Sequence, residues 1–142
     1  MSREDLEALR AEYEALSRKD WDAVLSTADR AFELKVPGGG LNVETILGPE
    51  KARRAFADFF SPFEDVSVEP EAFFEGNNRI VVFFLQRARP SGSTAFVERR
   101  AAHLWTMRDG KATQLEIFPE RVKALEAAGL SELDAPIDSS RG

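Results

Sequence analysis

The chain has 142 residues, the length of one domain, and 25 acidic against 19 basic side chains give it a net charge of −6. This balance argues against a general nucleic-acid-binding protein, because the neutralisation of phosphates needs a basic surface. The sequence contains no cysteine and a single histidine, which excludes disulfides, thiolate metal sites and any site that needs two histidines. We therefore expect no metal and no organic cofactor.

The sequence holds no apolar run long enough to cross a membrane. Its first ten residues are mostly charged or small and lack the apolar centre of a secretory signal. A cytoplasmic protein without a membrane partner is the expectation.

The first sixty residues predict three helices and a strand. Apolar spacing predicts a helix over 3–17, and Asp20 is typical of the N-cap of a second, short helix. Residues 30–37 have the pattern of a strand. Pro49 suits the first turn of a third helix, which Pro62 ends.

Residues 66–118 form strand-like runs separated by turn sequences at 76–78, 90–92 and Asp109-Gly110. An Asp-Gly pair between alternating segments is a strong hairpin signal. Four long strands joined by short turns therefore predict an antiparallel meander.

A last short helix is predicted from Pro119 to Ala128, and the polar residues 131–142 are predicted to be a C-terminal tail that folding does not need. Residues 1–130 are then one domain. Helices that precede a curved antiparallel sheet predict an α+β fold, with a ligand cavity between the helices and the concave face.

Four segments carry a resemblance to a known family: DWDAVL (20–25), AHLWTMRDGK (102–111), IFPER (117–121) and ALEAAGL (124–130). On these segments the chain resembles SnoaL-like members of the nuclear-transport-factor-2-like superfamily, which includes the ketosteroid isomerases. The resemblance covers about residues 3–130 and implies a cone-shaped α+β barrel. It leaves the activity open, because this fold hosts isomerases, cyclases, epoxide hydrolases, dehydratases and non-catalytic binders.

The resemblance implies three catalytic candidates. Ketosteroid-isomerase-like members use a tyrosine on the first helix and an acid on a late strand, and these positions match Tyr13 and His103. The position of their base falls near Lys35, and Glu33 is the nearest carboxylate on the same strand face. Cyclase-type members place an acidic base on the last strand, near Glu116, and the epoxide-hydrolase pattern would add Arg87.

The hairpin signal gives a register that does not depend on the resemblance. Counting back from Asp109-Gly110 without a bulge places His103 directly opposite Glu116, on the same face of the sheet. Each residue also has a purely structural interpretation: His103 in a cavity wall, Tyr13 in the core and Glu116 in solvent.

Charge is unevenly distributed along the meander. Residues 79–111 hold seven basic and two acidic side chains, whereas 64–75 hold five acidic side chains and no basic one. Two interpretations stay open: the charges pair across neighbouring strands, or Arg87 and Arg99 enter the cavity and bind an anion. Apolar candidates for the cavity wall are Phe56, Phe60 and Trp105.

The sequence therefore predicts a pocket for a small apolar molecule. The protein is either a cofactor-independent acid–base isomerase or cyclase that acts on a polyketide- or steroid-like carbonyl compound, or a non-catalytic ligand-binding or dimerisation module. Because the strand around Phe83 and Phe84 is apolar on both faces, a homodimer through the outer sheet face is also expected.

Overall fold

A computed structural model describes residues 3–39 and 42–139 and confirms the predicted α+β fold. Its helices and strands, in chain order, are α1 (Arg3–Ser17), α2 (Trp21–Leu25), β1 (Ala28–Gly39), β2 (Asn42–Leu47), α3 (Pro49–Phe60), β3 (Phe63–Gly76), β4 (Arg79–Pro90), β5 (Val97–Arg108), β6 (Lys111–Phe118), α4 (Arg121–Ala127) and β7 (Asp138–Ser139). No helix among these described residues is long and apolar enough to cross a membrane.

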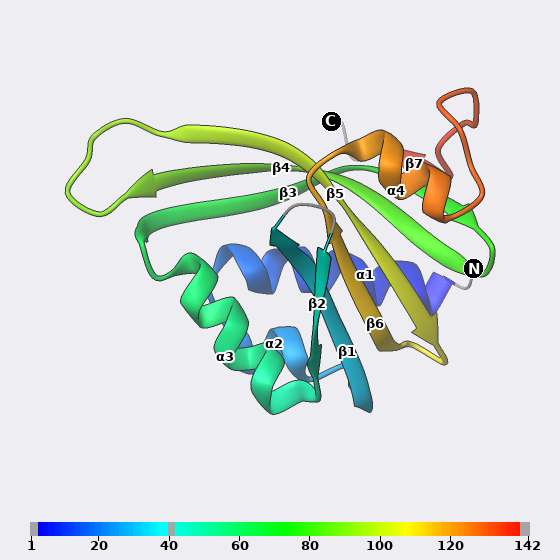
Figure 1. Cartoon of the computed structure of the whole chain (residues 1–142), viewed down its shortest axis with the longest axis horizontal. Helices are drawn as coiled ribbons and strands as arrows, with labels where there is room; N and C mark the ends of the chain where they lie inside the picture. The colour runs from blue at the N-terminus through cyan, green and yellow to red at the C-terminus, as the bar shows by residue number, and fades with distance from the viewer. Residues whose placement is uncertain (1–2, 40–41, 140–142) are drawn as a thin grey trace.

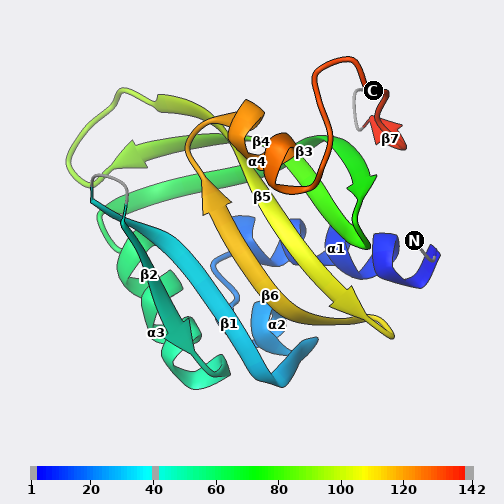
Figure 2. The same ribbon diagram turned by 45° about the vertical axis from the view of Figure 1, so that its right-hand side comes forward.

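The described strands form one curved sheet in the order β2-β1-β6-β5-β4-β3-β7. Strands β3 to β6 make the predicted antiparallel meander. The sheet as a whole is mixed, because β1 runs parallel to β6, and Figure 2 shows these two strands side by side.

Local sequence signals fix the ends of the elements. The Asp20 carboxylate accepts a hydrogen bond from the N–H of Ala23 at 3.2 Å and so caps α2. Asn77 and Asn78 have φ of 53° and 60°, and Asp109 and Gly110 have φ of 53° and 78°. Two consecutive positive φ angles are the requirement of a type I′ hairpin turn, so both turns suit the twist of their strands.

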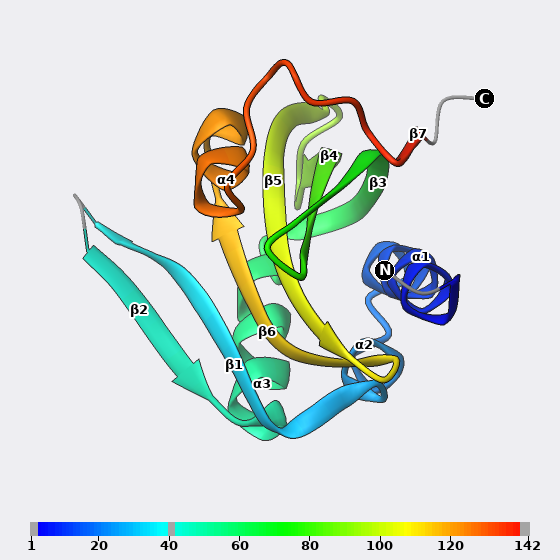
Figure 3. The same ribbon diagram turned by 90° about the vertical axis from the view of Figure 1, so that its right-hand side faces the viewer.

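The sheet has a covered apolar cluster on each face. Helices α1, α2 and α3 lie on the concave face, where the main core contains Leu9, Leu34 and Phe73. Helix α4 lies on the outer face, where Leu125 packs in a second cluster with Leu104. Figures 1 and 3 show α4 on the opposite side of the sheet from α1.

Helix α4 changes the interpretation of the outer face. The apolar outer surface that motivates the expected homodimer includes Val81 and Phe83, and both belong to the cluster under α4. That surface is covered within the chain itself, so the two-sided apolar pattern of β4 has an intramolecular explanation.

The register between β5 and β6 differs from the prediction. Met107 pairs with Ala112 as expected, but Thr106 pairs with Gln114, so Thr113 is an extra residue on β6. One extra residue in a strand turns every following side chain to the other face. His103 therefore lies opposite Ile117, and Glu116 lies opposite Leu104.

The end of the chain returns to the sheet. The N–H of Ile137 donates to the carbonyl of Phe73 at 2.7 Å, and Asp138 pairs with the same residue. This part of the predicted tail covers a short stretch of the β3 edge. Residues 140–142 of the tail lie outside the described residues.

Candidate functional site

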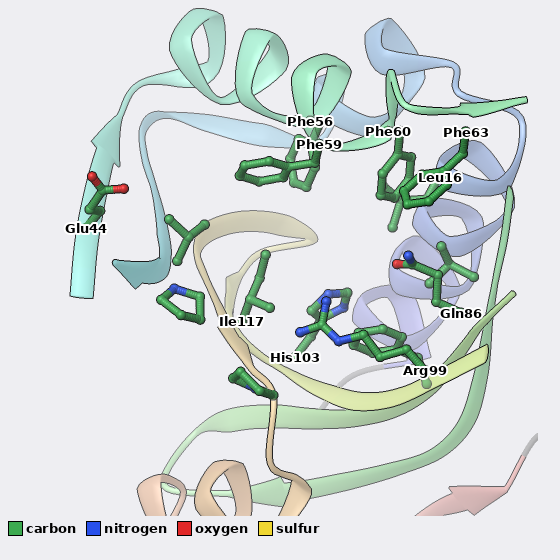
Figure 4. Close-up of a pocket in the computed structure, with 15 residues that line it drawn as sticks. Leu16, Glu44, Phe56, Phe59, Phe60, Phe63, Gln86, Arg99, His103 and Ile117 are labelled. Carbon is green, nitrogen blue, oxygen red and sulfur yellow. The ribbon is translucent and has the colours of Figure 1, made fainter. Parts of the chain in front are cut away.

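A cavity of about 500 Å³ opens between α3 and the concave face of the sheet. Its wall is mostly apolar and is formed by Leu16, Val36, Pro37, Glu44, Phe56, Phe59, Phe60, Phe63, Val68, Phe84, Gln86, Arg99, His103, Ile117 and Pro119. Figure 4 shows the phenylalanines of α3 on one side of the cavity and His103 and Arg99 on the other. The predicted pocket residues Phe56, Phe60, Arg99 and His103 are thus brought together.

Helix α3 positions the aromatic wall. Phe56 and Phe60 are four residues apart, so they share one face of the helix. Trp21 of α2 packs against both, with ring centroids 6.2 Å from Phe56 and 5.3 Å from Phe60. Trp21, which does not line the cavity itself, therefore holds this aromatic wall in place.

A buried hydrogen-bond chain holds His103 from the other side. The indole N–H of Trp105 donates to the hydroxyl of Tyr13 at 3.0 Å, and this hydroxyl lies 2.7 Å from Nδ1 of His103. The His103 ring also stacks on Phe84 with centroids 4.1 Å apart. Tyr13 and Trp105 are at most 2% exposed, so these contacts are shielded from water.

The Trp105–Tyr13–His103 hydrogen bonds fix which nitrogen of His103 carries the proton. An indole N–H can only donate, so Trp105 occupies one acceptor position of the Tyr13 oxygen. The single hydroxyl proton of Tyr13 then needs an acceptor, because a buried donor without a partner is costly, and Nδ1 of His103 is within reach. His103 is therefore the neutral tautomer protonated at Nε2, and Nε2–H is the donor it can offer to a ligand.

Burial keeps His103 and Tyr13, the two titratable groups of this hydrogen-bond chain, uncharged. Desolvation, with a smaller contribution from the charge of Arg99, lowers the pKa of His103 to about 3. Desolvation likewise raises the pKa of Tyr13 well above its usual value. At neutral pH the wall offers a hydrogen-bond donor at His103 and a positive charge at Arg99.

Five predicted site residues lie outside the cavity wall, and one of them is Tyr13, which supports His103 through Nδ1. Glu33 accepts a hydrogen bond from Gln114 at 3.3 Å on the outer side of the β1–β6 pair. Arg87 also lies on the outer face and pairs with Glu98. The remaining two are Glu116, which the bulge turns outward, and Trp105, which lies behind His103 as its indirect support.

Two carboxylates on the helical side or the rim are not among the predicted residues. Glu44 of β2 lines the cavity. Glu12 is 4% exposed, accepts a hydrogen bond from the Thr27 hydroxyl at 2.7 Å, and has its pKa raised by burial to about 7. A signal for Glu12 exists in the sequence, since it lies three residues after Leu9 and four before Leu16 on the apolar stripe of α1.

No group of three or more histidine, cysteine, aspartate or glutamate side chains within residues 3–39 and 42–139 is arranged to hold a metal ion.

Comparison with known proteins places this geometry among related folds. TerC, crystallised with polyporic acid, is 28% identical, with a TM-score of 0.71 over 89% of this chain and 98% of that one. A protein of ketosteroid-isomerase-like fold from Catenulispora acidiphila, in complex with trimethylamine, is 16% identical, with a TM-score of 0.70 over 92% and 98%. Rv0760c from Mycobacterium tuberculosis, in complex with estradiol-17β-hemisuccinate, is 16% identical, with a TM-score of 0.67 over 82% and 93%.

No curated protein matches the sequence significantly. The fold is nuclear-transport-factor-2-like, as the likeness to solved structures shows. The family model of the SnoaL-like domain matches residues 9–115, which include the helices and most of the strands around the cavity. The chain therefore belongs to the SnoaL-like domain family.

Proposed function

We propose that the cavity binds a small, mostly apolar carbonyl compound and that His103 donates its Nε2–H to the carbonyl oxygen. The observation that carries this proposal is the Trp105–Tyr13–His103 chain, which commits Nδ1 and leaves a neutral donor on a residue of the cavity wall. A preorganised donor in an apolar site binds a carbonyl oxygen more strongly than water does. The polyporic acid in TerC and the steroid derivative in Rv0760c support a small organic ligand.

A cofactor-independent isomerase or cyclase is the second candidate function. The same cavity wall contains a carboxylate, Glu44, which is the type of group that abstracts a proton from a carbon next to a carbonyl. His103 would polarise the carbonyl as a neutral hydrogen-bond donor. Because its pKa is about 3, the ring is not the charged imidazolium at neutral pH and cannot act as the acid. Turnover that Glu44→Gln abolishes while ligand affinity stays within about twofold would favour the enzyme over the binding module.

A matched pair of probes tests the binding proposal. 2-Acetylnaphthalene and 2-ethylnaphthalene have similar shape, and only the ketone accepts a hydrogen bond. Titration calorimetry should show the ketone binding about fivefold more tightly, the effect of one net hydrogen bond. His103→Phe should remove this preference, whereas Lys35→Gln on the outer face should keep it.

Equal affinity of the two probes for the unmodified protein, or binding of neither, would overturn the proposal. Because His103→Phe leaves the Tyr13 hydroxyl without its acceptor, the unfolding midpoint of each variant is measured first. His103→Gln, which retains an amide donor, provides a second variant if the phenylalanine variant does not fold.

Self-association, location and domain extent also stay proposals. A homodimer through the part of the outer sheet face that α4 does not cover predicts a light-scattering mass of twice the chain, and a monomer at micromolar concentration would exclude it. A cytoplasmic location is likewise proposed from the sequence alone. We also propose that residues 1–130 are the folding unit.

A further inference from the structure

Four arginines lie near the connecting loop of the β4–β5 hairpin: Arg87, Arg89, Arg99 and Arg100. All but Arg99 have a carboxylate partner. Arg99 has no hydrogen bond or ion pair with any residue that the structure describes, and its cross-strand partner is the neutral Gln86. The paired arginines and their partners are Arg87 with Glu98 at 3.0 Å, Arg89 with Glu64 at 3.0 Å and with Asp65, and Arg100 with Glu71 at 3.9 Å. Pairing with carboxylates therefore explains the other three of these four arginines and leaves Arg99 unexplained.

The strand period explains why Arg99 is separate. Arg99 and His103 are four residues apart on β5, so their side chains leave the same, concave face. Arg87 and Arg100 leave the outer face, where the acidic partners lie. Arg99 thus stands alone on the cavity side.

Arg99 acts in the same space as His103. Its positive charge is one of the causes that lower the pKa of His103. Figure 4 shows the guanidinium end of Arg99 extending along the cavity wall toward His103, with Gln86 on the neighbouring strand. A cation and a neutral N–H donor therefore border one region of an otherwise apolar cavity.

We propose that this region is an anion subsite and that the natural ligand is an apolar carboxylate. The planar guanidinium of Arg99 would hold both carboxylate oxygens, and the apolar body would lie against Phe56 and Phe60. This rests on the proposed function, since it assigns an acidic group to the molecule that the same cavity binds.

An acid and its ester test the subsite. 2-Naphthoate and methyl 2-naphthoate share one ring system and differ in charge. At about pH 7, where the acid is ionised, the unmodified protein should bind the acid at least about tenfold more tightly than the ester, because a hydrogen bond to a charged group is worth that factor. Arg99→Gln should weaken the acid about 10- to 100-fold and change the ester by less than about twofold.

Arg100→Gln is the matched control, because it removes the same charge from the next residue on the outer face and should leave both affinities unchanged. Equal affinity of acid and ester, or equal losses in Arg99→Gln and Arg100→Gln, would overturn the subsite. The two proposals can fail separately. If the preference for 2-acetylnaphthalene is lost in His103→Phe but the affinity for 2-naphthoate is unchanged in Arg99→Gln, the subsite fails and the proposed function stands. Failure of every probe to bind would overturn both.

Discussion

The hydroxyl of Tyr13 and Nδ1 of His103 lie 2.7 Å apart and join α1 to β5 inside the core. Because Trp105 donates to the same hydroxyl, the three side chains form one buried polar unit in which the Trp105 N–H, the Tyr13 hydroxyl and Nδ1 of His103 are all hydrogen-bonded. A buried polar chain that is fully satisfied stabilises one arrangement, and the loss of any member leaves its neighbours unpaired.

Tyr13→Phe tests the energetic value of this unit. The substitution keeps the ring and leaves two buried groups, the Trp105 N–H and Nδ1 of His103, without a partner. We expect a loss of about 1–3 kcal/mol in the free energy of unfolding, measured by urea denaturation. The double variant Tyr13→Phe/His103→Phe should lose less than the sum of the single variants. Additive losses would show that the chain is not energetically coupled.

The proton position on His103 can be measured directly. His103 is the single histidine of the chain, so nitrogen-15 spectra report on it without overlap. We expect a neutral ring protonated at Nε2 from neutral pH down to about pH 4, because the pKa of His103 is lowered to about 3. A ring that becomes charged near pH 6, or one protonated at Nδ1, would contradict the hydrogen bonds assigned to Tyr13 and His103.

Glu12 makes stability fall as pH rises. Its pKa is about 7 in the folded chain against 4.5 ordinarily, so between these values the folded state holds a proton that the unfolded state has released. Its contribution is complete below pH 4.5 and is lost as pH rises to about 7. Glu12→Gln should therefore gain stability relative to the unmodified chain across this window, and thermal unfolding between pH 4 and pH 8 would show it.

Glu14→Gln, at an exposed position on the same helix, is the control for the Glu12 experiment and should show no such pH-dependent gain. Parallel pH profiles of Glu12→Gln and the unmodified chain would mean that Glu12 is ionised in the fold.

His103 acts in the opposite direction, and its effect is clearest in the Glu12→Gln background. The pKa of His103 is lowered from 6.5 to about 3, so below pH 6.5 the unfolded state binds a proton that the folded state does not. The free energy of unfolding should fall by about 1.4 kcal/mol for each pH unit from 6.5 toward 3. Adding His103→Phe should make this acid slope shallower, and an unchanged slope would assign the acid sensitivity to other groups.

Deletion of residues 131–142 should cost less than about 1 kcal/mol and leave a folded chain, because the described part of this segment contributes one short strand and mostly exposed side chains. Deletion of residues 130–142 should cost more, since Leu130 packs against the cluster under α4. Comparison of the two unfolding midpoints separates the tail from that cluster. A large loss in the shorter deletion would mean that the strand at Ile137 is essential.

The sequence predicts the elements of this fold better than the faces of its strands. The Asp20 cap, Pro49 in the first turn of α3 and the Asp109-Gly110 turn are local signals, and each agrees with the structure. The last helix begins at Arg121, two residues after the predicted Pro119. The parallel pairing of β1 with β6 depends on how distant segments meet, and no local pattern contains it. The same is true of α4, whose position on the outer face explains apolar residues that the sequence alone assigns to a dimer.

The candidate site was predictable up to the bulge. Phe56 and Phe60 follow from helix spacing, His103 from the resemblance and Arg99 from the uneven charge of the meander, and all four line the cavity. Glu116 is placed wrongly because alternation counted from the turn assumes an unbroken strand. Ala112 and Leu115 are both buried although they are three residues apart, and a regular strand cannot place both on one face. That odd spacing is the signal for an extra residue between them.

The bulge at Thr113 has a consequence for chain length. Removal of Thr113 would join Ala112 to Gln114 in unbroken alternation, so Leu115 and Ile117 would still face the cavity side. Removal of Gln114 would have the same effect, whereas loss of Glu116 would turn the rest of the strand over and move Ile117 off the cavity face. The stretch between Ala112 and Leu115 is therefore the part of this strand that can lose or regain one codon without turning the following side chains over, and chains of this architecture can differ in length by one residue there while keeping the same cavity wall.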